Sequence, residues 1–285
     1  MGTALIIVGI VAALIAAAWY GWWAKKKRRQ ELALAAQQFG LQYAPVDTFN
    51  CLALPFGLLS RGDGRGTENV LWGAWQGMDL REFDYWYYDR TTDSKGQTSK
   101  TYYHFSCVVT EIPLTAPDLS VTKENIFTRF ADHVGLRDIE FESEDFNREF
   151  NVKSRDKKFA NDVIDARMMQ WLLQSGEGWA FEMNGPYVLV YHKRLRPAEL
   201  TPLLGAVRMY VEHIPKVAYS LYGDPAKAAQ LYGITSPEQQ AAPPTATAPG
   251  AAMPPGGTVP PPASGPPVAP PPPGTSSPGS GGFQP

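Results

Sequence analysis

An uninterrupted run of apolar residues opens the chain, from Ala4 to Trp23, and contains no charged side chain. A helix of about 20 residues is roughly 30 Å long, which matches the hydrocarbon layer of a bilayer. Aromatic rings gather in its last turn, where they favour the headgroup level, and five cations follow. The predicted membrane-interface residues are Trp19, Tyr20, Trp22, Trp23, Lys25, Lys26, Lys27, Arg28 and Arg29. The pattern predicts a transmembrane anchor over residues 1–24.

The alternative to an anchor is a cleaved secretory signal, with the small residues at 16–18 as its cleavage site. Signal peptides carry their positive charge before the apolar core, whereas here the cations come after it. The same asymmetry predicts an N-terminus outside and a cytoplasmic domain, because basic flanks stay in the cytoplasm. No second run is long enough for a further span.

Residues 25–40 have a composition that favours helix, so the anchor is expected to continue as a short basic juxtamembrane stalk. Leu32, Ala35, Ala36 and Phe39 recur at helical spacing. Gly40 is a suitable C-terminal stop.

From Tyr43 to Pro113 the pattern changes to period-two alternation broken by turn residues. The glycines of RGDGRG at 61–66, the Gln76-Gly77 pair and the polar stretch 89–100 are the predicted turns. An antiparallel meander is therefore expected. In its third strand Cys107 falls on the apolar face and is expected in the core.

The second strand of this meander carries aromatic residues on both faces. Phe83, Tyr85 and Tyr87 share one face by alternation, and Trp86 and Tyr88 share the other. Five rings are too many for one core face and one solvated face. Trp86 and Tyr88 are therefore the candidate partner surface, unless a helix covers them.

Residues 114–236 mix strand and helix patterns. The predicted strands lie near 119–122, at 139–143 and at 145–153, through Phe150 and Val152. The predicted helices lie at 123–134, after a Ser154 cap, and from Pro197 to Pro215, and a hairpin is predicted at Asn184-Gly185. Residues 41–236 are thus expected to form one α+β globular domain, in which amphipathic helices pack on an antiparallel sheet.

From Pro237 to the end, residues 237–285 consist largely of Pro, Gly, Ala, Ser and Thr, and hold most of the chain's 26 prolines. Such a segment buries too little apolar surface to offset its ordering entropy, so a disordered tail is predicted. Its P-x-x-P spacings could dock into aromatic grooves or arise by chance in a solvated spacer.

The net charge and the cysteine content limit which partners and which cellular compartment the sequence allows. Residues 30–236 carry a net charge of about −6, because the basic flank and Glu238 account for the rest of the chain's −2. An acidic domain argues against nucleic acid, which rewards clustered Lys and Arg. Cys51 and Cys107 fit a reducing compartment without disulfides. An inverted topology, with the domain facing the envelope, would instead predict a Cys51–Cys107 bridge.

No motif in the chain names a reaction. His104, His133, His192 and His213 are isolated, and no spacing of histidine or cysteine matches a metal site. The acidic run at 140–145 lacks the order of a calcium loop. No catalytic residue, metal or cofactor is therefore predicted. The competing hypothesis is an enzyme or small-ligand binder whose site is assembled from distant residues such as Asp84, His104 and Glu111.

The domain resembles a family of single-span bacterial membrane proteins that carry a cytoplasmic domain of unknown function. The matching features are the anchor with its basic flank, Phe39-Gly40, Pro55-Phe56, Asn69-Val70-Leu71 before Gly73, Phe83-Asp84-Tyr85, and Phe146-Asn147 with Phe150 and Val152 ahead of the helix that contains Trp171. The resemblance covers roughly residues 30–215 and implies a bacterial inner-membrane setting. It supplies no catalytic residues.

Together these patterns predict a single-pass protein that contacts the bilayer and a protein partner. A non-enzymatic binding or scaffold module fits the missing catalytic motif and the surplus of aromatic residues. The polyproline tail would extend its reach.

Overall fold

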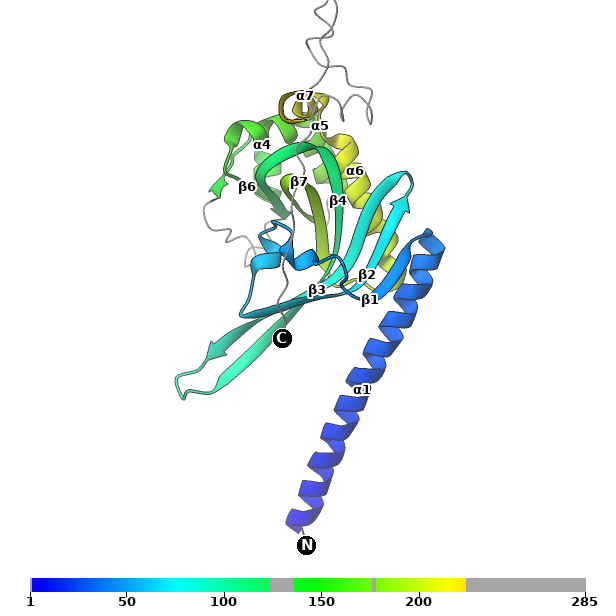
Figure 1. Cartoon of the computed structure of the whole chain (residues 1–285). Helices are drawn as coiled ribbons and strands as arrows, with labels where there is room; N and C mark the ends of the chain where they lie inside the picture. Colours follow the sequence, from blue (N-terminus) through cyan, green and yellow to red (C-terminus); the bar gives the residue numbers. More distant parts are fainter. Residues whose placement is uncertain (1, 124–135, 176–177, 224–285) are drawn as a thin grey trace, which may run out of the picture. The chain divides into compact units, whose positions relative to one another are not determined.

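The computed structural model describes residues 2–123, 136–175 and 178–223 (Figure 1). It confirms the α+β class: a long N-terminal helix is followed by a seven-stranded antiparallel sheet and several shorter helices. The helix predicted at 123–134 falls almost wholly outside the described residues, and the tail at 237–285 falls entirely outside them.

The N-terminal helix α1 (Gly2–Phe39) is continuous through the apolar run and the basic flank. It ends at Gly40, whose φ of +71° is the left-handed geometry that a glycine tolerates without strain. By length and composition, α1 is the one helix of the described residues that could cross a membrane. Its second half is part of the domain, because Leu32 and Ala36 are buried in the core.

Seven strands pair antiparallel in the order β1-β2-β3-β4-β6-β5, and β7 pairs with β4. They are β1 (Gln42–Val46), β2 (Gly64–Trp75), β3 (Met78–Thr92), β4 (Thr98–Lys123), β5 (Arg137–Asp138), β6 (Phe150–Ser154) and β7 (Ala180–Lys193). The meander β2-β3-β4 is confirmed. Its first turn lies at Gln76-Gly77, where both φ angles are positive, as in the tight turns that fit hairpin twist.

The predicted break at Pro113 was wrong, because β4 runs unbroken from Thr98 to Lys123 and includes the strand expected near 119–122. The register with β7 shifts on both sides of Ala116, so the strand absorbs its prolines in bulges. Residues 105–110 of β4 pair with β3 on one edge and β7 on the other. This strand therefore lies at the centre of the sheet.

The hairpin predicted at Asn184-Gly185 was also wrong. These residues lie inside the continuous strand β7, and Gly185 pairs with Ala116 where the register shifts. Its φ of +57° accommodates a bulge and not a chain reversal. A long partner strand, invisible to local sequence, outweighs the turn signal.

The region 139–163 differs from its prediction as well. Residues 144–149 form helix α3 (Glu144–Glu149), whose N-cap Ser143 accepts a hydrogen bond from the Phe146 amide. Residues 139–143 are not a strand, and β6 pairs with β4 on one edge and with β5 on the other. The next helix is capped by Asp156 and not by Ser154, whose hydroxyl donates to the Asp118 carbonyl.

The remaining helical segments are the 3-10 turns η1 (Cys51–Ala53), η2 (Leu58–Ser60) and η3 (Pro197–Glu199), and the helices α4 (Lys157–Val163), α5 (Ala166–Ser175), α6 (Leu200–His213) and α7 (Lys216–Tyr222). The apolar side of α6 was predicted correctly, and its Leu200, Leu203 and Val207 are buried. The larger core lies between the helices and one sheet face. The segment 51–60 covers a smaller core on the other face, which includes Phe83, Tyr85 and Cys107.

Candidate functional site

Four aromatic side chains lie together on the β3–β4 hairpin, on the sheet face that bears α1. Trp86 and Tyr88 stand opposite His104 and Tyr102 in the β3–β4 register. The ring centroids of Trp86 and Tyr88 are 6.4 Å apart with nearly parallel planes, and those of Tyr88 and Tyr102 are 5.2 Å apart. We call these four residues the aromatic stripe. Tyr102 is 52% exposed, and Trp86 and Tyr88 are half-buried.

Glycines of the neighbouring strand β2 form the bed of the stripe. Gly66 pairs with Trp86 and Gly64 with Tyr88. A Cβ atom at Gly66 would lie 2.8 Å from Trp86 Cζ2, and one at Gly64 would lie 2.5 Å from Tyr88 Cε1. The rings therefore lie flat over β2 because these two residues have no side chain. The prediction that Gly64 and Gly66 form a turn was wrong, since both belong to the strand.

Cations flank the stripe toward the hairpin turn. Lys100 Nζ lies 4.5 Å from the centroid of the Tyr88 ring, and the Arg90 guanidinium carbon lies 5.7 Å from it. Arg90 Nη2 also donates to the Tyr88 hydroxyl at 3.2 Å. The distances from Lys100 and Arg90 to the Tyr88 ring both fall within the range of cation–π attraction. This end of the stripe is amphipathic and positively charged.

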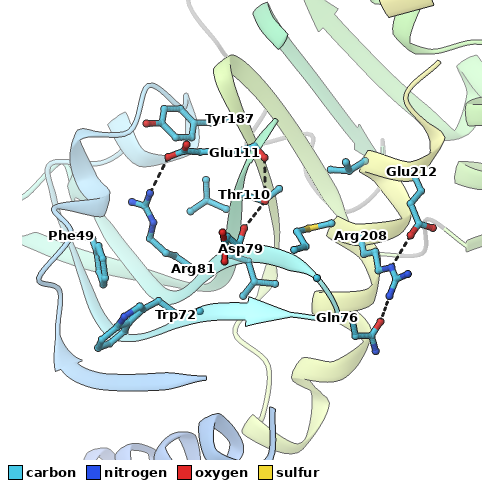
Figure 2. Close-up of a pocket in the computed structure, with 16 residues that line it drawn as sticks. Phe49, Trp72, Gln76, Asp79, Arg81, Thr110, Glu111, Tyr187, Arg208 and Glu212 are labelled. Carbon is cyan, nitrogen blue, oxygen red and sulfur yellow. Dashed lines mark hydrogen bonds and ion pairs between the residues drawn. The ribbon is translucent and has the colours of Figure 1, made fainter. Parts of the chain in front are cut away.

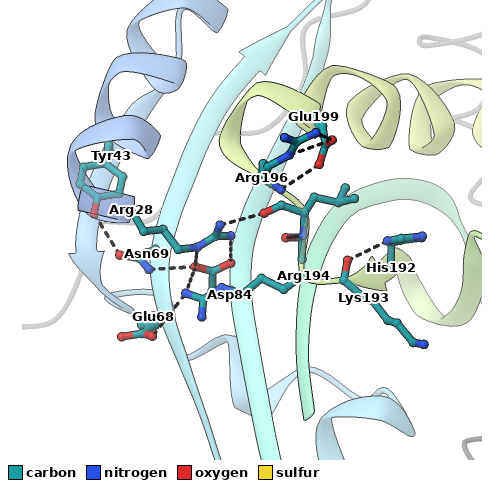
Figure 3. Close-up of polar contacts among 12 residues, drawn as sticks. Arg28, Tyr43, Glu68, Asn69, Asp84, His192, Lys193, Arg194, Arg196 and Glu199 are labelled. Carbon is teal, nitrogen blue, oxygen red and sulfur yellow. Dashed lines mark hydrogen bonds and ion pairs between the residues drawn. The ribbon is translucent and has the colours of Figure 1, made fainter. Parts of the chain in front are cut away.

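At its other end the stripe reaches an ion pair that joins α1 to the sheet (Figure 3). Arg28 donates from Nε and Nη2 to the two carboxylate oxygens of Asp84, at 2.7 and 2.5 Å. Its Nη1 donates to the Leu195 carbonyl at 2.8 Å. Asn69 and Arg194 also donate to Asp84, at 2.8 and 3.2 Å. Such a bidentate bond fixes orientation as well as distance.

Arg28 was predicted to lie at the membrane interface, yet its side chain is only 13% exposed and is committed to Asp84. The other flank cations differ. Lys26 and Lys27 lie over the rings of Trp22 and Trp23, at 5.2 and 5.4 Å. The four predicted interface rings, Trp19, Tyr20, Trp22 and Trp23, are exposed, and they remain candidates for the headgroup layer.

Beneath this pair lies a carboxyl group that the sequence did not single out. Glu82 is fully buried on the same face as Asp84, and neither of its oxygens has a hydrogen-bond partner among the described residues. Burial raises the pKa of Glu82 well above its ordinary value, and the charge of Asp84 adds to the rise. The charges of Arg28 and Arg194 lower the pKa of Glu82 but by less than burial raises it. The side chain is therefore protonated over a wider pH range than an exposed glutamate.

A groove of about 630 Å³ lies at the β2–β3 turn, between the sheet and α6 (Figure 2). Phe49 and Trp72 meet edge to face at 5.1 Å on one side. The Arg81 guanidinium lies 5.3 Å from the Phe49 ring and pairs with Glu111 at 3.3 Å. On the other side Arg208 of α6 pairs with Glu212 at 2.7 Å. The groove thus combines aromatic rings with arginines whose charges are neutralised by paired glutamates.

A second cavity of about 600 Å³ lies under the 52–61 segment. Arg155 at its rim pairs with Asp118 at 2.6 Å. Deeper in, Glu182 accepts hydrogen bonds from the amide of Gly57 and the hydroxyl of Tyr191, at 2.8 and 3.2 Å. Its polar groups are thus used to hold the segment on the sheet.

The residues named for a distributed catalytic site do not converge. His104 and Glu111 are seven residues apart on one strand, which is about 23 Å, and Glu111 borders the groove whereas Asp84 is bound to Arg28. Within the described ranges, no group of three His, Cys, Asp or Glu side chains is placed to hold a metal ion.

Cys51 and Cys107 are both buried and unbridged in the smaller core. Burial raises the pKa of the Cys51 thiol to about 12, so little of it is thiolate at neutral pH.

The fold and the site define an α+β domain that is built onto the end of a long apolar helix and displays two aromatic surfaces. No family model and no curated protein matches the chain. One similar solved structure is described as the crystal structure of the mycobacterial trehalose monomycolate transport factor A, TtfA. The two are 13% identical with a TM-score of 0.49, and the match covers 66% of this chain and 96% of that one. At this level of similarity nothing is transferred from that protein to this chain.

Proposed function

We propose that this protein is a single-span, membrane-anchored binding module without enzymatic activity, which holds a protein partner at the bilayer surface. The observation that carries the proposal is the construction of α1. Its first half has the length and composition of a span, and Leu32 and Arg28 of its second half belong to the domain. The domain is thereby tied to its anchor by packing and by an ion pair, and not by a flexible linker.

The groove of Figure 2 is the surface that we assign to the protein partner. Aromatic and arginine side chains are enriched at the centres of protein interfaces, and here Phe49, Trp72, Tyr187, Arg81 and Arg208 line one depression. Phe49 is 37% exposed and is available to a partner. The prediction that Trp86 and Tyr88 form the partner surface stays a prediction, and their position beside Arg28 suggests a different occupant.

The test is quantitative affinity purification of the full-length protein from crosslinked native membranes. A Phe49→Ser/Arg208→Ser variant is compared with Val217→Ser, which changes an exposed apolar residue outside the groove. We expect a near-stoichiometric partner that the groove variant loses and the control keeps. Equal recovery by both variants would contradict the groove assignment, and no enrichment over an unrelated single-span protein would contradict the binding function.

We further propose that the domain and tail are cytoplasmic, in a bacterial inner membrane as the family resemblance implies. Four exposed or half-exposed cations besides Arg28 follow the apolar run and support this orientation. An impermeant maleimide applied to intact cells should leave a Ser94→Cys variant unlabelled until the cells are permeabilised. The native thiols are buried and leave this measurement clear.

A further inference from the structure

The aromatic stripe has no role in the fold that requires its exposure. The rings of Phe83, Tyr85 and Tyr87 on the opposite face of β3 are buried under the 51–60 segment. Trp86, Tyr88 and Tyr102 face outward, although they lie on the same face as Asp84, where α1 docks. On this sheet face Glu82 and Asp84 are buried, whereas the described residues of the hairpin beyond Asp84 are half-buried or exposed. An aromatic surface of this kind is expected to have an occupant.

The position of the stripe follows from Arg28. Trp23, the last residue of the apolar run, precedes Arg28 by five residues, which is about 7–8 Å along the helix axis. Tyr88 follows Asp84 by four residues, which is about 13 Å along the strand. Because Arg28 and Asp84 are in direct contact, the end of the apolar run and the Tyr88 end of the stripe lie about 8 and 13 Å from this contact, measured along the helix and along the strand. In Figure 1 the β3–β4 hairpin projects from the side of the sheet that lies away from α5 and α7, and the N-terminal half of α1 extends on that side as well.

The charges on the outward face of the β3–β4 hairpin are consistent with a position near the bilayer surface. Beyond Trp86, the outward face of the described hairpin carries the cations Arg90 and Lys100, and its carboxylates Asp89 and Asp93 alternate to the other side or cap the turn. Asp63, the nearest acidic neighbour, accepts a hydrogen bond from the Arg90 amide. Burial and Arg194 lower the pKa of His104, Asp84 and Glu68 act against this lowering, and Lys25 of the basic flank adds a smaller lowering. Between the flank and the hairpin, Glu68 and Asp84 pair with Arg28, Arg29 and Arg194, so the cations of the flank and those of the hairpin form two positive patches on one face.

We infer that the aromatic stripe, together with Arg90 and Lys100, is a second membrane contact that lies in the headgroup layer of an anionic bilayer. This inference rests on the proposed anchor. Tyrosine and tryptophan favour the headgroup level, and lysine and arginine beside them attract anionic lipid. The anchor makes the contact intramolecular, so even a weak surface affinity is sufficient to keep the hairpin on the bilayer. The domain then rests on two points, the end of α1 and the hairpin, and cannot rotate freely about the helix.

The experiment uses the full-length protein in vesicles of equal parts phosphatidylglycerol and phosphatidylcholine, with a nitroxide on a fraction of the headgroups. A fluorophore is attached to Ser94→Cys at the hairpin turn, or to the matched control Gln170→Cys, an exposed position on α5. We expect quenching at position 94 to be at least about twice that at position 170, and to weaken in vesicles of phosphatidylcholine alone. A Tyr88→Ser/Lys100→Gln/Tyr102→Ser variant should lose the excess quenching with an unchanged melting temperature.

Equal quenching at positions 94 and 170, or equal quenching with and without the triple substitution, would overturn the inference. So would a hairpin that is unquenched in these vesicles but protected in native membranes, since the stripe would then bind a protein. Resistance to carbonate extraction separates this outcome from failure of the anchor. A protein that is extracted lacks the proposed span, whereas one that stays in the membrane without quenching at position 94 has the span but no second contact.

Discussion

Removing the guanidinium of Arg28 tests how the domain is joined to its helix. In Arg28→Ala, Asp84 loses two of its hydrogen bonds, and its side chain is only 3% exposed in the native structure. Breaking a buried ion pair by deleting one partner costs about 3–5 kcal/mol, because the other charge remains buried. Asn69 and Arg194 still donate to Asp84, so we expect a loss of about 2–3 kcal/mol in the free energy of unfolding.

The matched control is Lys27→Ala, one residue away on the same helix. Lys27 pairs with Glu31 at 3.8 Å, and both side chains are largely exposed, so its loss should cost less than about 0.5 kcal/mol. The assay is denaturant unfolding of the full-length protein in detergent micelles, followed by far-ultraviolet circular dichroism. Arg28→Lys should fall between wild type and Arg28→Ala, because an ammonium cannot make the two-pronged bond. If Arg28→Ala and Lys27→Ala are equally stable, Arg28 is an ordinary flank cation and the proposed rigid junction is refuted.

Two further predictions concern residues under and beside this junction. The pKa of Glu82 is raised in the folded state, so the folded protein keeps a proton that the unfolded chain releases above the ordinary pKa of 4.5. Between 4.5 and the raised pKa, the free energy of unfolding should therefore fall as the pH rises, by about 1.4 kcal/mol per pH unit. Glu82→Gln should flatten this slope in unfolding titrations, and a wild-type stability that rises over the window would mean an ionised, paired Glu82. Gly66→Ala should lower the melting temperature and change the near-ultraviolet signal of Trp86. Gly205 lies in the middle of α6 with open space around it, so Gly205→Ala should raise the melting temperature slightly. Equal effects of the two alanines would show that Trp86 does not need the glycine bed.

The parts of the fold that sequence predicted correctly are those that local periodicity decides. The helix 2–39, the meander and the buried side of α6 each carry their own pattern of apolar residues and a suitable stop, as Gly40 and Gln76-Gly77 illustrate. In these segments the neighbours along the chain are also the neighbours that determine the structure.

The wrong predictions share the opposite property. Pro113 reads as a strand end and Asn184-Gly185 reads as a hairpin, yet each lies within a strand whose partner is about 70 residues away. Pairing along the whole of β4 and β7 satisfies more backbone groups than either local break would. Local turn chemistry could not reveal this, because the competing bonds come from distant sequence.

The candidate site was predicted in part. Alternation alone placed Trp86 and Tyr88 on the strand face opposite Phe83, Tyr85 and Tyr87, but it gave no sign that Gly64 and Gly66 lie beneath them. The ion pair between Arg28 and Asp84 could not be predicted from the sequence for a related reason. Arg28 is one of five adjacent cations, and only the packing of Leu32 on the sheet selects the one that faces Asp84.

The selection of one cation among five has a physical consequence for the whole protein. Arg28 and Leu32 are one helical turn apart, so they occupy the same side of α1 and fix its rotation about its own axis relative to the sheet. If the first half of the same helix spans the bilayer, that rotation also sets which sheet face approaches the lipid, and it is the face of the aromatic stripe. The groove beside α6 would then be held at a constant height above the membrane. A partner bound there would be positioned by the anchor helix itself, because no linker separates the two.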